Sequence, residues 1–386
     1  MTDLGSRESR TAPPDAAGAA ADWVVYFSAT PWHGGAHRQH ALARQLATGY
    51  RVLFVDPPGL RVRTGTTVRR VEPAVWHAVA PTPVPFGRHL PTANAVNRRV
   101  AVAALRRWLR HDPAGVRLVW LDEDLAAPCA DRLDAAAVVY DATDLDWTFT
   151  RRWNRHHLRR SLDRAVAAAD LVLASSAALP TRMPAGRHAP VVLPNACDPE
   201  HFAPQGPTVP RPVAASRPLI GYCGAVDTRA FDADLVATVA RAHPDWTFLL
   251  IGPSTAAGRA PLAGLANVLL TGPIPYADLP ATLRACDVTV IPYRIGGLVD
   301  YVHPKKCYEY LALGKPVVAT PLPALTALTD VVRLAAGPDE FARAIAGALT
   351  DATAPDQLAR RRAVATANSW AARGEHLHRL LAGLAR

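Results

Sequence analysis

Short apolar runs rich in β-branched residues alternate with Ala-, Leu- and Arg-rich stretches from Trp23 onward. This strand–helix–strand alternation predicts a parallel sheet with helices covering both faces. In the first half we expect strands at Trp23–Ser28, Val52–Val55, Val116–Leu121, Ala137–Asp141, Leu171–Ala174 and Val191–Leu193. The helices expected there are Ala36–Ala47, Ala93–Arg110, Arg151–Ala168 and Ser176–Met183, and Val62–Pro91 is assigned only a strand or two.

A proline-rich segment separates this series from a second one. Pro204–Pro218 reads PQGPTVPRPVAASRP, which has little to bury and predicts an interdomain linker. The strands expected after it are Leu219–Cys223, Trp246–Ile251, Val268–Leu270, Val288–Ile291 and Val317–Ala319. The helices are Ala233–His243, Tyr276–Ala285 and Lys305–Leu313. We therefore predict a disordered tail over residues 1–22, an N-terminal domain over 23–203, a linker over 204–218 and a C-terminal domain over 219–354. A closing helical segment, residues 355–386, is expected to pack back toward the N-terminal domain.

Composition narrows the class of protein and its partners. Of 386 residues, Lys and Arg number 43 against 33 for Asp and Glu, which gives a net charge of +10 and favours an anionic partner. Nucleotide phosphates, a phospholipid surface and nucleic acid all qualify. The five cysteines form no CxxC pair, so reduced thiols and a cytoplasmic location are expected. The longest uncharged stretch, Ala260–Ala277, is broken by prolines and glycines and does not predict a membrane-spanning helix.

The segment Val290–Thr320 carries the strongest chemical signal. A strand ends at Pro292, a glycine-containing loop follows, and a helix opens at Pro304. Lysines in the first turn of a helix are unfavourable unless an anion offsets them, so Lys306 and its neighbour indicate an anion site at the helix N-terminus. Glu309, one turn further on, is suited to accept hydrogen bonds from a diol such as ribose. The alternative is a capped surface helix with solvated lysines and an ion pair between Glu309 and Lys305.

The same segment resembles family 4 of the GT-B glycosyltransferases, a retaining family, and in particular its polysaccharide and teichuronic-acid-type branch. The shared pattern is Pro304, Lys306, Glu309-Tyr310-Leu311-Ala312 and Gly314–Ala319. The resemblance implies an α/β architecture of two Rossmann-like, doubly wound parallel-sheet domains that face each other across a cleft. It also implies a nucleotide-diphosphate sugar as co-substrate, with no metal and no cofactor. Glu309 would then hold the ribose, and Pro304 and Lys306 would lie at the diphosphate.

One departure from the family pattern concerns the donor sugar. The family usually has a first glutamate eight residues before the second, but position 301 is Tyr301 and its neighbour is Asp300. Whether either residue replaces the missing carboxylate stays open.

Further donor-binding residues follow from their positions after strands. Gly224 in LIGYCGAV and Gly252 in WTFLLIGP resemble the family's phosphate-contacting turns. Gly34 and Gly35, after the first strand, would let backbone approach a ligand. Arg229 and Arg294 are candidate diphosphate ligands because a guanidinium matches phosphate geometry, although each is otherwise a surface residue.

The acceptor side is assigned to the N-terminal half. His37 and Arg38 lie in a stretch that resembles the branch's R-Q-x-x-L-A helix, and their alternative role is on a helix surface. Asp141 and Asp144 follow a strand and would bind acceptor hydroxyls or stabilise a positively charged transition state, unless they cap the strand end. Together with Lys306 they are the catalytic candidates. A metal triad of His33, His37 and His40 is discounted because no acid joins it.

The predicted activity is retaining sugar transfer to a glycan, lipid-linked or small-molecule acceptor. The alternatives are a catalytically degenerate GT-B partner subunit and a sugar-nucleotide epimerase. Nucleic acid is not expected, because the basic residues lack interleaved aromatics. Arginine-rich stretches would instead allow peripheral contact with an anionic membrane, or are simply solvated helix faces. These stretches are Arg98–Arg110, Arg151–Arg164 and Arg360–Arg362.

Overall fold

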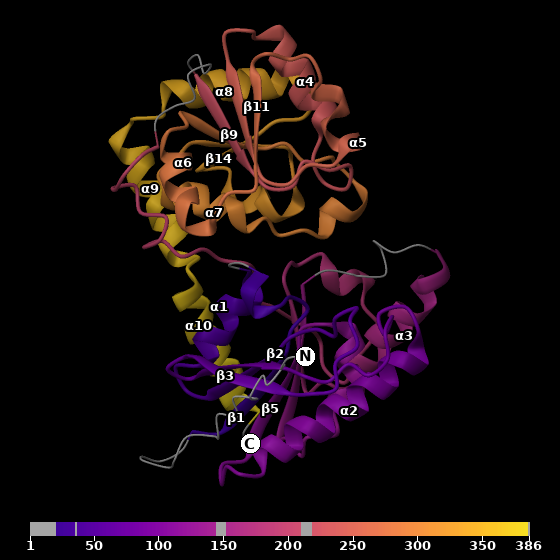
Figure 1. Ribbon diagram of the computed structural model, residues 1–386. Helices are drawn as coiled ribbons and strands as arrows, with labels where there is room; N and C mark the ends of the chain where they lie inside the picture. The colour runs from indigo at the N-terminus through magenta and orange to yellow at the C-terminus, as the bar shows by residue number, and fades with distance from the viewer. Residues whose placement is uncertain (1–20, 35–36, 144–151, 210–217, 385–386) are drawn as a thin grey trace, which may run out of the picture. The chain divides into compact units, whose positions relative to one another are not determined.

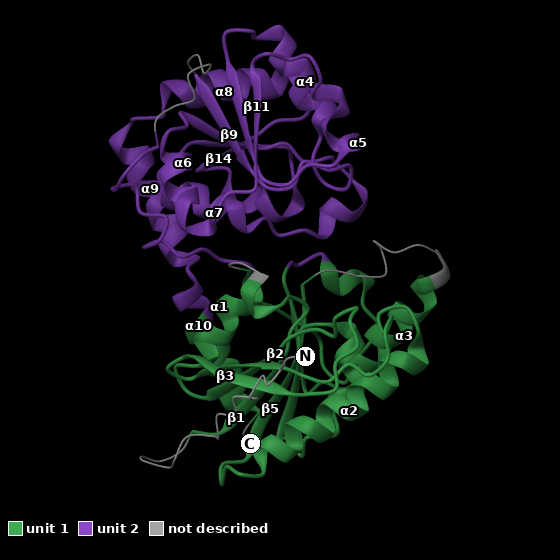
Figure 2. Cartoon of the chain, in the orientation of Figure 1, with its two compact units in different colours: residues 1–175, 179–193, 374–386 green, residues 176–178, 194–373 purple. Residues whose placement is uncertain are grey.

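The computed structural model describes residues 21–34, 37–143, 152–209 and 218–384 (Figure 1). The chain forms two compact units (Figure 2). Unit 1 takes residues 1–175, 179–193 and 374–386, and unit 2 takes residues 176–178 and 194–373. Nearly all of the tail expected over residues 1–22, and residues 210–217 of the expected linker, lie outside the described residues.

Unit 1 is built on one eight-stranded sheet. Its strands are β1 (Trp23–Phe27), β2 (Arg51–Val55), β3 (Thr67–Glu72), β4 (Val75–Val79), β5 (Val116–Leu121), β6 (Ala137–Ala142), β7 (Leu171–Ala174) and β8 (Val191–Val192). They lie in the order β3-β4-β2-β1-β5-β6-β7-β8, and every neighbouring pair is parallel except β3 with β4. The helical elements include η1 (Trp32–Gly34), α1 (Arg38–Leu46), α2 (Pro91–Leu109), η2 (Asp124–Cys129), α3 (Arg152–Ala168) and η4 (Leu179–Arg182).

Central strand β1 is buried along its whole length. Tyr26 stacks between Phe54 and Trp120, with ring centroids 5.3 and 5.4 Å away, and Trp23 packs edge-on against Trp108. Such burial requires cover on both faces of the sheet, which explains why the strand reads as an unbroken apolar run rather than as an alternation.

Unit 2 is built on a six-stranded, fully parallel sheet. Its strands are β9 (Leu219–Cys223), β10 (Thr247–Ile251), β11 (Val268–Gly272), β12 (Val288–Ile291), β13 (Val317–Ala319) and β14 (Val332–Leu334), in the order β11-β10-β9-β12-β13-β14. The helical elements are α4 (Ala233–Ala242), α5 (Ala256–Arg259), η5 (Ala260–Leu262), η6 (Tyr276–Asp278), α6 (Leu279–Arg284), η7 (Gly297–Tyr301), α7 (Lys305–Ala312), η8 (Pro323–Leu328), α8 (Pro338–Thr350) and α9 (Pro355–Ala367); α10 (Trp370–Gly383) belongs to both units.

Both sheets confirm the predicted doubly wound class, because in each the strand order reverses next to the first strand of the series. The reversal lies between β1 and β5 in unit 1 and between β9 and β12 in unit 2. In open α/β sheets, ligands bind outside the carboxyl ends of the strands at such a reversal. The topology therefore predicts that a ligand binds directly after β1 and β5 in unit 1 and directly after β9 and β12 in unit 2.

Two predicted helices differ in the structure. Ser176–Met183 was expected to be helical, but only a 3-10 turn forms at η4, because Pro180 and Pro184 interrupt the segment. Tyr276–Ala285 divides into η6 followed by α6, with Pro280 in the first turn of α6. Strand β14 and helix α8 were not expected from the sequence.

The division between the units does not fall in the proline-rich segment. Residues 194–203 already belong to unit 2, where Cys197 and Phe202 are fully buried in the core. The Cys197 N–H donates to the carbonyl of Asn368, which ties this stretch to the end of α9. From Gly374 the closing helix belongs to unit 1, where His378 Nε2 lies 2.9 Å from the carbonyl oxygen of Gln45. Among the described residues, no helix has the length and apolar character that crossing a bilayer requires.

Candidate functional site

Helix α7 opens at the carboxyl edge of the unit 2 sheet. The chain leaves β12, passes through η7 and enters α7 after Pro304, and Gly314, with φ at +73°, ends the helix. The chain has only three lysines among its 43 basic residues, and all three, Lys305, Lys306 and Lys315, lie in this helix or just after it. A protein that uses arginine almost everywhere else therefore places compact ammonium groups here.

Lys306 reaches back from α7 to the end of β9 and to the residues just after β12. Its Nζ donates to the Tyr293 hydroxyl at 2.8 Å, lies 3.4 Å from the Tyr222 hydroxyl, and sits 4.8 and 4.4 Å from the two ring centroids. Among the described residues Lys306 has no carboxylate partner. Although burial disfavours the charged form, the oxygens of the two tyrosines raise its pKa above the ordinary lysine value. The site thus holds a positive charge that the fold itself leaves unneutralised.

Gly224 brings main chain directly against this ammonium. Its φ is +155°, and a Cβ there would collide with Lys306 Nζ and the Tyr222 hydroxyl. Gly252, with φ at +139°, packs in turn against the carbonyl of Gly224, and the Gly224 N–H donates to the carbonyl of Ile251 at 2.8 Å. The two predicted glycines are therefore neighbours: Gly224 borders Lys306, and Gly252 supports Gly224 from behind.

Glu309 lies one turn further along α7 and is only 3% exposed. Its Oε1 is 3.0 Å from Lys305 Nζ, and Lys305 Nζ also lies 5.1 Å from the centroid of the Tyr276 ring. The ion pair matches the surface-helix alternative raised from the sequence. Lys306 does not, because it is held between two tyrosine rings instead of extending into solvent.

Arg229 and Arg294 are carried by neighbouring loops. The Arg294 N–H donates to the carbonyl of Ala230 at 2.8 Å, which joins the loop after β9 to the loop after β12. Each guanidinium has an acidic partner: Arg229 lies 2.9 Å from Asp227, and Arg294 lies 3.4 Å from Asp234. The two side chains are 66% and 41% exposed, so both lie at the rim with charges that are already paired.

In unit 1, two predicted acceptor-side residues are bonded to each other. Arg38 donates from Nε and Nη2 to the two carboxylate oxygens of Asp141, at 2.9 and 2.7 Å, and the side chains are 4% and 0% exposed. His37 is exposed at the N-cap of α1, and Gly34 ends η1. Gly35 and Asp144 lie outside the described residues.

Known proteins resemble this chain in sequence and in fold. Residues 217–351 match the family model described as Glycosyl transferases group 1. This part of the chain is similar to the group 1 glycosyltransferases. A candidate teichuronic acid biosynthesis glycosyltransferase of Bacillus subtilis (strain 168), TuaH, is 29% identical over 203 residues, which are 48% of this chain and 51% of that protein. The chain thus spans about half the length of this curated relative.

Solved structures match the fold of both units. Sucrose-phosphate synthase from Thermosynechococcus elongatus matches with a TM-score of 0.71 at 17% identity, covering 94% of this chain and 99% of that one. Starch synthase IV from Arabidopsis thaliana matches at 0.65 and 12%, covering 95% and 100%. Anabaena Alr3699/HepE, crystallised with UDP and glucose, matches at 0.62 and 17%, covering 93% and 99%. At these identities the likeness concerns the fold.

The loop with the missing glutamate is held in place through its backbone. Ser176 Oγ donates to the carbonyl of Tyr301 at 2.7 Å, and Asn195 Nδ2 donates to the carbonyl of His303 at 2.7 Å. Asp300 is half-buried within η7. These side-chain bonds fix the entry into α7, although Tyr301 stands where the family pattern has its first carboxylate.

Sequence reasoning missed Asp122, directly after β5. Its carboxylate accepts from the Ala29 N–H at 2.8 Å and from Gln39 Nε2 at 3.2 Å. Burial, reinforced by the nearby charge of Asp141, raises its pKa well above the ordinary value. The acidic run that begins at Asp122, immediately after a predicted strand, was the available signal. Tyr222 and Tyr293 were also missed, because aromatic residues at strand ends are ordinary core residues in sequence.

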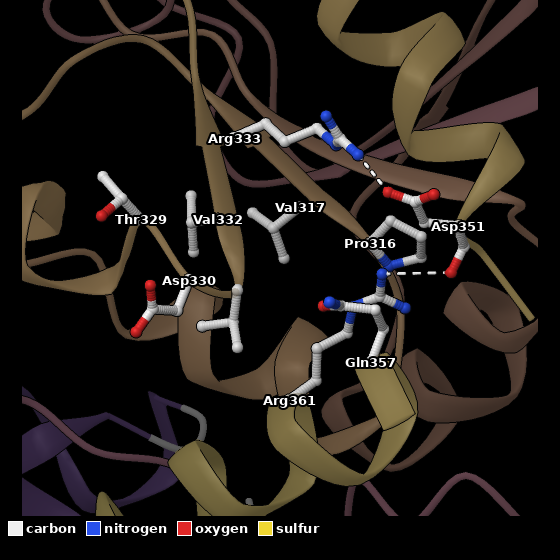
Figure 3. A pocket seen from close by; sticks show the side chains of 10 residues that line it. Pro316, Val317, Thr329, Asp330, Val332, Arg333, Asp351, Gln357 and Arg361 are labelled. Atoms are coloured by element: carbon white, nitrogen blue, oxygen red, sulfur yellow. Dashed lines mark hydrogen bonds and ion pairs between the residues drawn. The ribbon is translucent and has the colours of Figure 1, made fainter. Parts of the chain in front are cut away.

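No metal cluster accompanies these residues in the part of the chain that the structure describes. Over the described ranges, no three His, Cys, Asp or Glu side chains are arranged to hold a metal ion. A cavity of about 180 Å³ lies at the opposite, amino-terminal ends of β13 and β14 (Figure 3). The buried guanidinium of Arg361 there donates to the carbonyls of Gly314, Asp351 and Ala352, at 3.2 to 3.4 Å. Arg361 therefore joins α9 to the ends of α7 and α8 and belongs to the fold.

Proposed function

We propose that the protein is a retaining glycosyltransferase that moves a sugar from a nucleoside diphosphate donor to a hydroxyl group of its acceptor. The observation that carries this proposal is the ammonium of Lys306, which the described residues leave without a carboxylate partner at the strand-order reversal of unit 2. A bound anion would neutralise the positive charge held in this position, and the helix N-terminus beside it favours phosphate.

The donor is proposed to bind along the edge formed by β9, β12 and α7. Lys306 and the first N–H groups of α7 would neutralise the diphosphate, and Gly224 would allow its oxygens to approach the backbone closely. Glu309 would accept hydrogen bonds from the ribose, and in the free protein its carboxylate is paired with Lys305. Arg229 and Arg294 would exchange their acidic partners for phosphate oxygens at the rim.

The reaction is proposed to proceed through charge stabilisation. The bond between the anomeric carbon and the diphosphate oxygen breaks, the leaving diphosphate takes the electron pair, and positive charge develops on the sugar ring. The acceptor hydroxyl then attacks from the same face, and its proton passes to the leaving oxygen. Lys306 and the α7 N-terminus stabilise the charge that develops on the leaving group, which is the largest catalytic contribution expected in such a site.

Metal independence and a hexosyl donor are part of the proposal. The ammonium and the helix N-terminus supply positive charge at the leaving group, which is the role that a divalent ion serves in metal-dependent transfer. Turnover should therefore persist in excess chelator. For the acceptor, the name of the Bacillus subtilis relative favours a surface glycan, and lipid-linked or small-molecule acceptors remain in the panel to be tested.

Nucleotide binding provides the direct test. Thermal unfolding of the wild-type protein should shift upward with at least one nucleoside diphosphate, and Lys306→Met should abolish the shift. Lys315→Met is the matched control: Lys315 Nζ donates to the carbonyls of Arg284 and Cys286, so its loss should lower the melting temperature and leave the nucleotide response intact. The nucleotide site is wrong if Lys306→Met binds as the wild type does.

Product analysis then tests the reaction. With a panel of nucleoside diphosphate sugars and hydroxyl acceptors, the product should keep the anomeric configuration of the donor, as read by NMR. An inverted product would contradict the mechanism. Because Tyr301 stands where the family has a glutamate, a catalytically degenerate partner subunit is the second candidate, and nucleotide binding without any transfer would favour it.

A further inference from the structure

The cavity at the amino-terminal ends of β13 and β14 is lined in part by polar side chains that the fold does not use. It has a volume of about 180 Å³ and lies at the opposite edge of the unit 2 sheet from α7. Figure 3 shows Thr329 and Asp330 on one side of the cavity and Gln357 and Arg361 on the other. Within the described ranges, the side chains of Thr329, Asp330 and Gln357 have no hydrogen-bond or ion-pair partner. The cavity thus has room for several hydrogen bonds to a ligand.

Arg361 brings a buried positive charge to the wall of this cavity. Its side chain is 4% exposed, and no carboxylate of the described residues forms an ion pair with it. Both terminal nitrogens donate to the carbonyls of Gly314, Asp351 and Ala352 at 3.2 to 3.4 Å, whereas the buried Nε has no hydrogen-bond partner in the described part of the chain. Burial accordingly lowers the pKa of Arg361. A buried donor of this kind costs free energy unless a ligand or a water molecule accepts from it.

The charges around the cavity favour a neutral ligand. Arg333 pairs with Asp351, which leaves the guanidinium of Arg361 opposite the exposed carboxylate of Asp330. Both terminal nitrogens of Arg361 already donate to main-chain carbonyls, whereas a phosphate or carboxylate is bound best by a free pair of N–H groups. Those carbonyls also lie at the C-terminal ends of α7 and α8, where partial negative charge disfavours an anion. A ligand without net charge that both donates and accepts hydrogen bonds fits this set.

We propose that this cavity binds one neutral sugar residue. Sugar hydroxyl groups both donate and accept, so they match the carboxylate of Asp330, the amide of Gln357 and the Nε–H of Arg361. Val317 and Val332, each 1% exposed, give the cavity an apolar wall on which the C–H groups of a sugar ring can pack. A free monosaccharide and a unit within a longer glycan present the same groups to this site.

The cavity is separate from the proposed donor site. None of the residues assigned to the nucleoside diphosphate lines it, and it lies at the other edge of the sheet. A sugar site away from the transfer centre suits an enzyme that retains a glycan acceptor, and this use rests on the proposed function. Sugar binding itself needs no donor, so nucleotide binding and sugar binding are measurements that can fail independently.

Ligand-observed NMR tests the proposal on the full chain. Saturation transfer from the protein is measured to free glucose, galactose and mannose and to neutral oligosaccharides built from them. Transfer to a free hexose identifies a monosaccharide site, and transfer to an oligosaccharide alone identifies a site for a unit within a glycan. Lys306→Met should leave the transfer unchanged, because Lys306 does not line the cavity. No transfer to any of these sugars, or displacement of the sugar by inorganic phosphate or acetate, would overturn the proposal.

Two variants of the lining assign the signal to the cavity. Asp330→Ala removes a charged acceptor from an exposed position, so sugar binding should weaken about tenfold with little change in melting temperature. Asp339→Ala is the matched control, because it removes an exposed carboxylate of unit 2 that does not line the cavity, and it should bind as the wild type does. Gln357→Leu keeps a similar side-chain volume without the amide and should weaken binding about fivefold. If Asp330→Ala and Gln357→Leu both bind sugar normally, the sugar lies elsewhere, the cavity holds only water and the proposal is wrong.

Discussion

Arg38 and Asp141 lie 103 residues apart in the sequence and form a two-pronged ion pair that solvent hardly reaches. Arg38 comes from the first turn of α1 and Asp141 from β6, so the pair joins the helix after the first strand to the far side of the strand-order reversal in unit 1. A carboxylate that accepts hydrogen bonds on both oxygens is poorly placed to contact an acceptor. The pair instead holds the first turn of α1 against β6.

Removing one partner of this pair should therefore affect stability first. Asp141→Ala removes both hydrogen bonds and the opposite charge that Asp141 gives to the buried guanidinium of Arg38, and it is expected to cost about 3–5 kcal/mol in the free energy of unfolding. The double variant Arg38→Met, Asp141→Leu should recover most of that loss, because apolar side chains of similar volume replace both charges. Urea unfolding measures both values. A stable, inactive Asp141→Ala would instead support the catalytic role first assigned to Asp141.

Asp122 should make unfolding depend on pH. Its folded pKa is raised, so the stability it contributes is fully present below the unfolded value of about 4 and is lost as the pH rises through the folded value. Asp122→Asn should therefore flatten the stability curve above about pH 4. Unfolding free energies measured across that range check this, and an unchanged slope would contradict it.

Asp112 provides the control of opposite sign. Although burial acts to raise its pKa, the two hydrogen bonds from Arg51, at 2.6 and 2.9 Å, lower it below the ordinary value. Its stabilising contribution is present above the unfolded pKa and is lost as the pH falls through the folded one. Asp112→Asn should therefore weaken the protein at neutral pH and have little effect in acid.

The fold was largely predictable because its signals are local. An apolar run such as Trp23–Phe27 can be covered on both faces only inside a parallel sheet, and the order of elements then limits the topology. The predicted helix was wrong where prolines interrupt an otherwise helical pattern of residues, as in Ser176–Met183. The unit boundary failed because Cys197 is buried against α9, a contact between residues far apart in sequence that composition does not reveal.

The candidate site was predictable where backbone chemistry sets the residue type. Glycine at position 224 and proline before α7 follow from turn and helix geometry. The partners of each charge were not predictable, because they come from other strands: Tyr222 and Tyr293 meet Lys306 only once β9 and β12 are side by side. For the same reason Arg38 and Asp141 were assigned to an acceptor and not to each other.

Arg361 should behave as a structural residue of unit 2. It is 4% exposed and donates only to main-chain carbonyls at the ends of α7 and α8. Arg361→Ala removes these bonds and opens space beneath α9, so a loss of about 2–4 kcal/mol in unfolding free energy is expected. The exposed neighbour Arg362→Ala should change stability by less than about 0.5 kcal/mol. If the two variants have the same free energy of unfolding in urea, Arg361 does not stabilise the ends of α7 and α8 as proposed.

Alanine substitutions at three glycines should separate backbone strain from contact with the site. All three have positive φ, so each Cβ costs about 1–2 kcal/mol through strain alone. At Gly264 nothing lies within 4 Å, and strain should be the whole effect. At Gly252 the Cβ meets the carbonyl of Gly224, so the loss of stability should be largest of the three. At Gly224 it meets the movable Lys306 ammonium, so nucleotide binding should fall more than the melting temperature does. Calorimetry with and without nucleoside diphosphate gives both quantities, and a Gly224→Ala protein that binds nucleotide normally would place the diphosphate elsewhere.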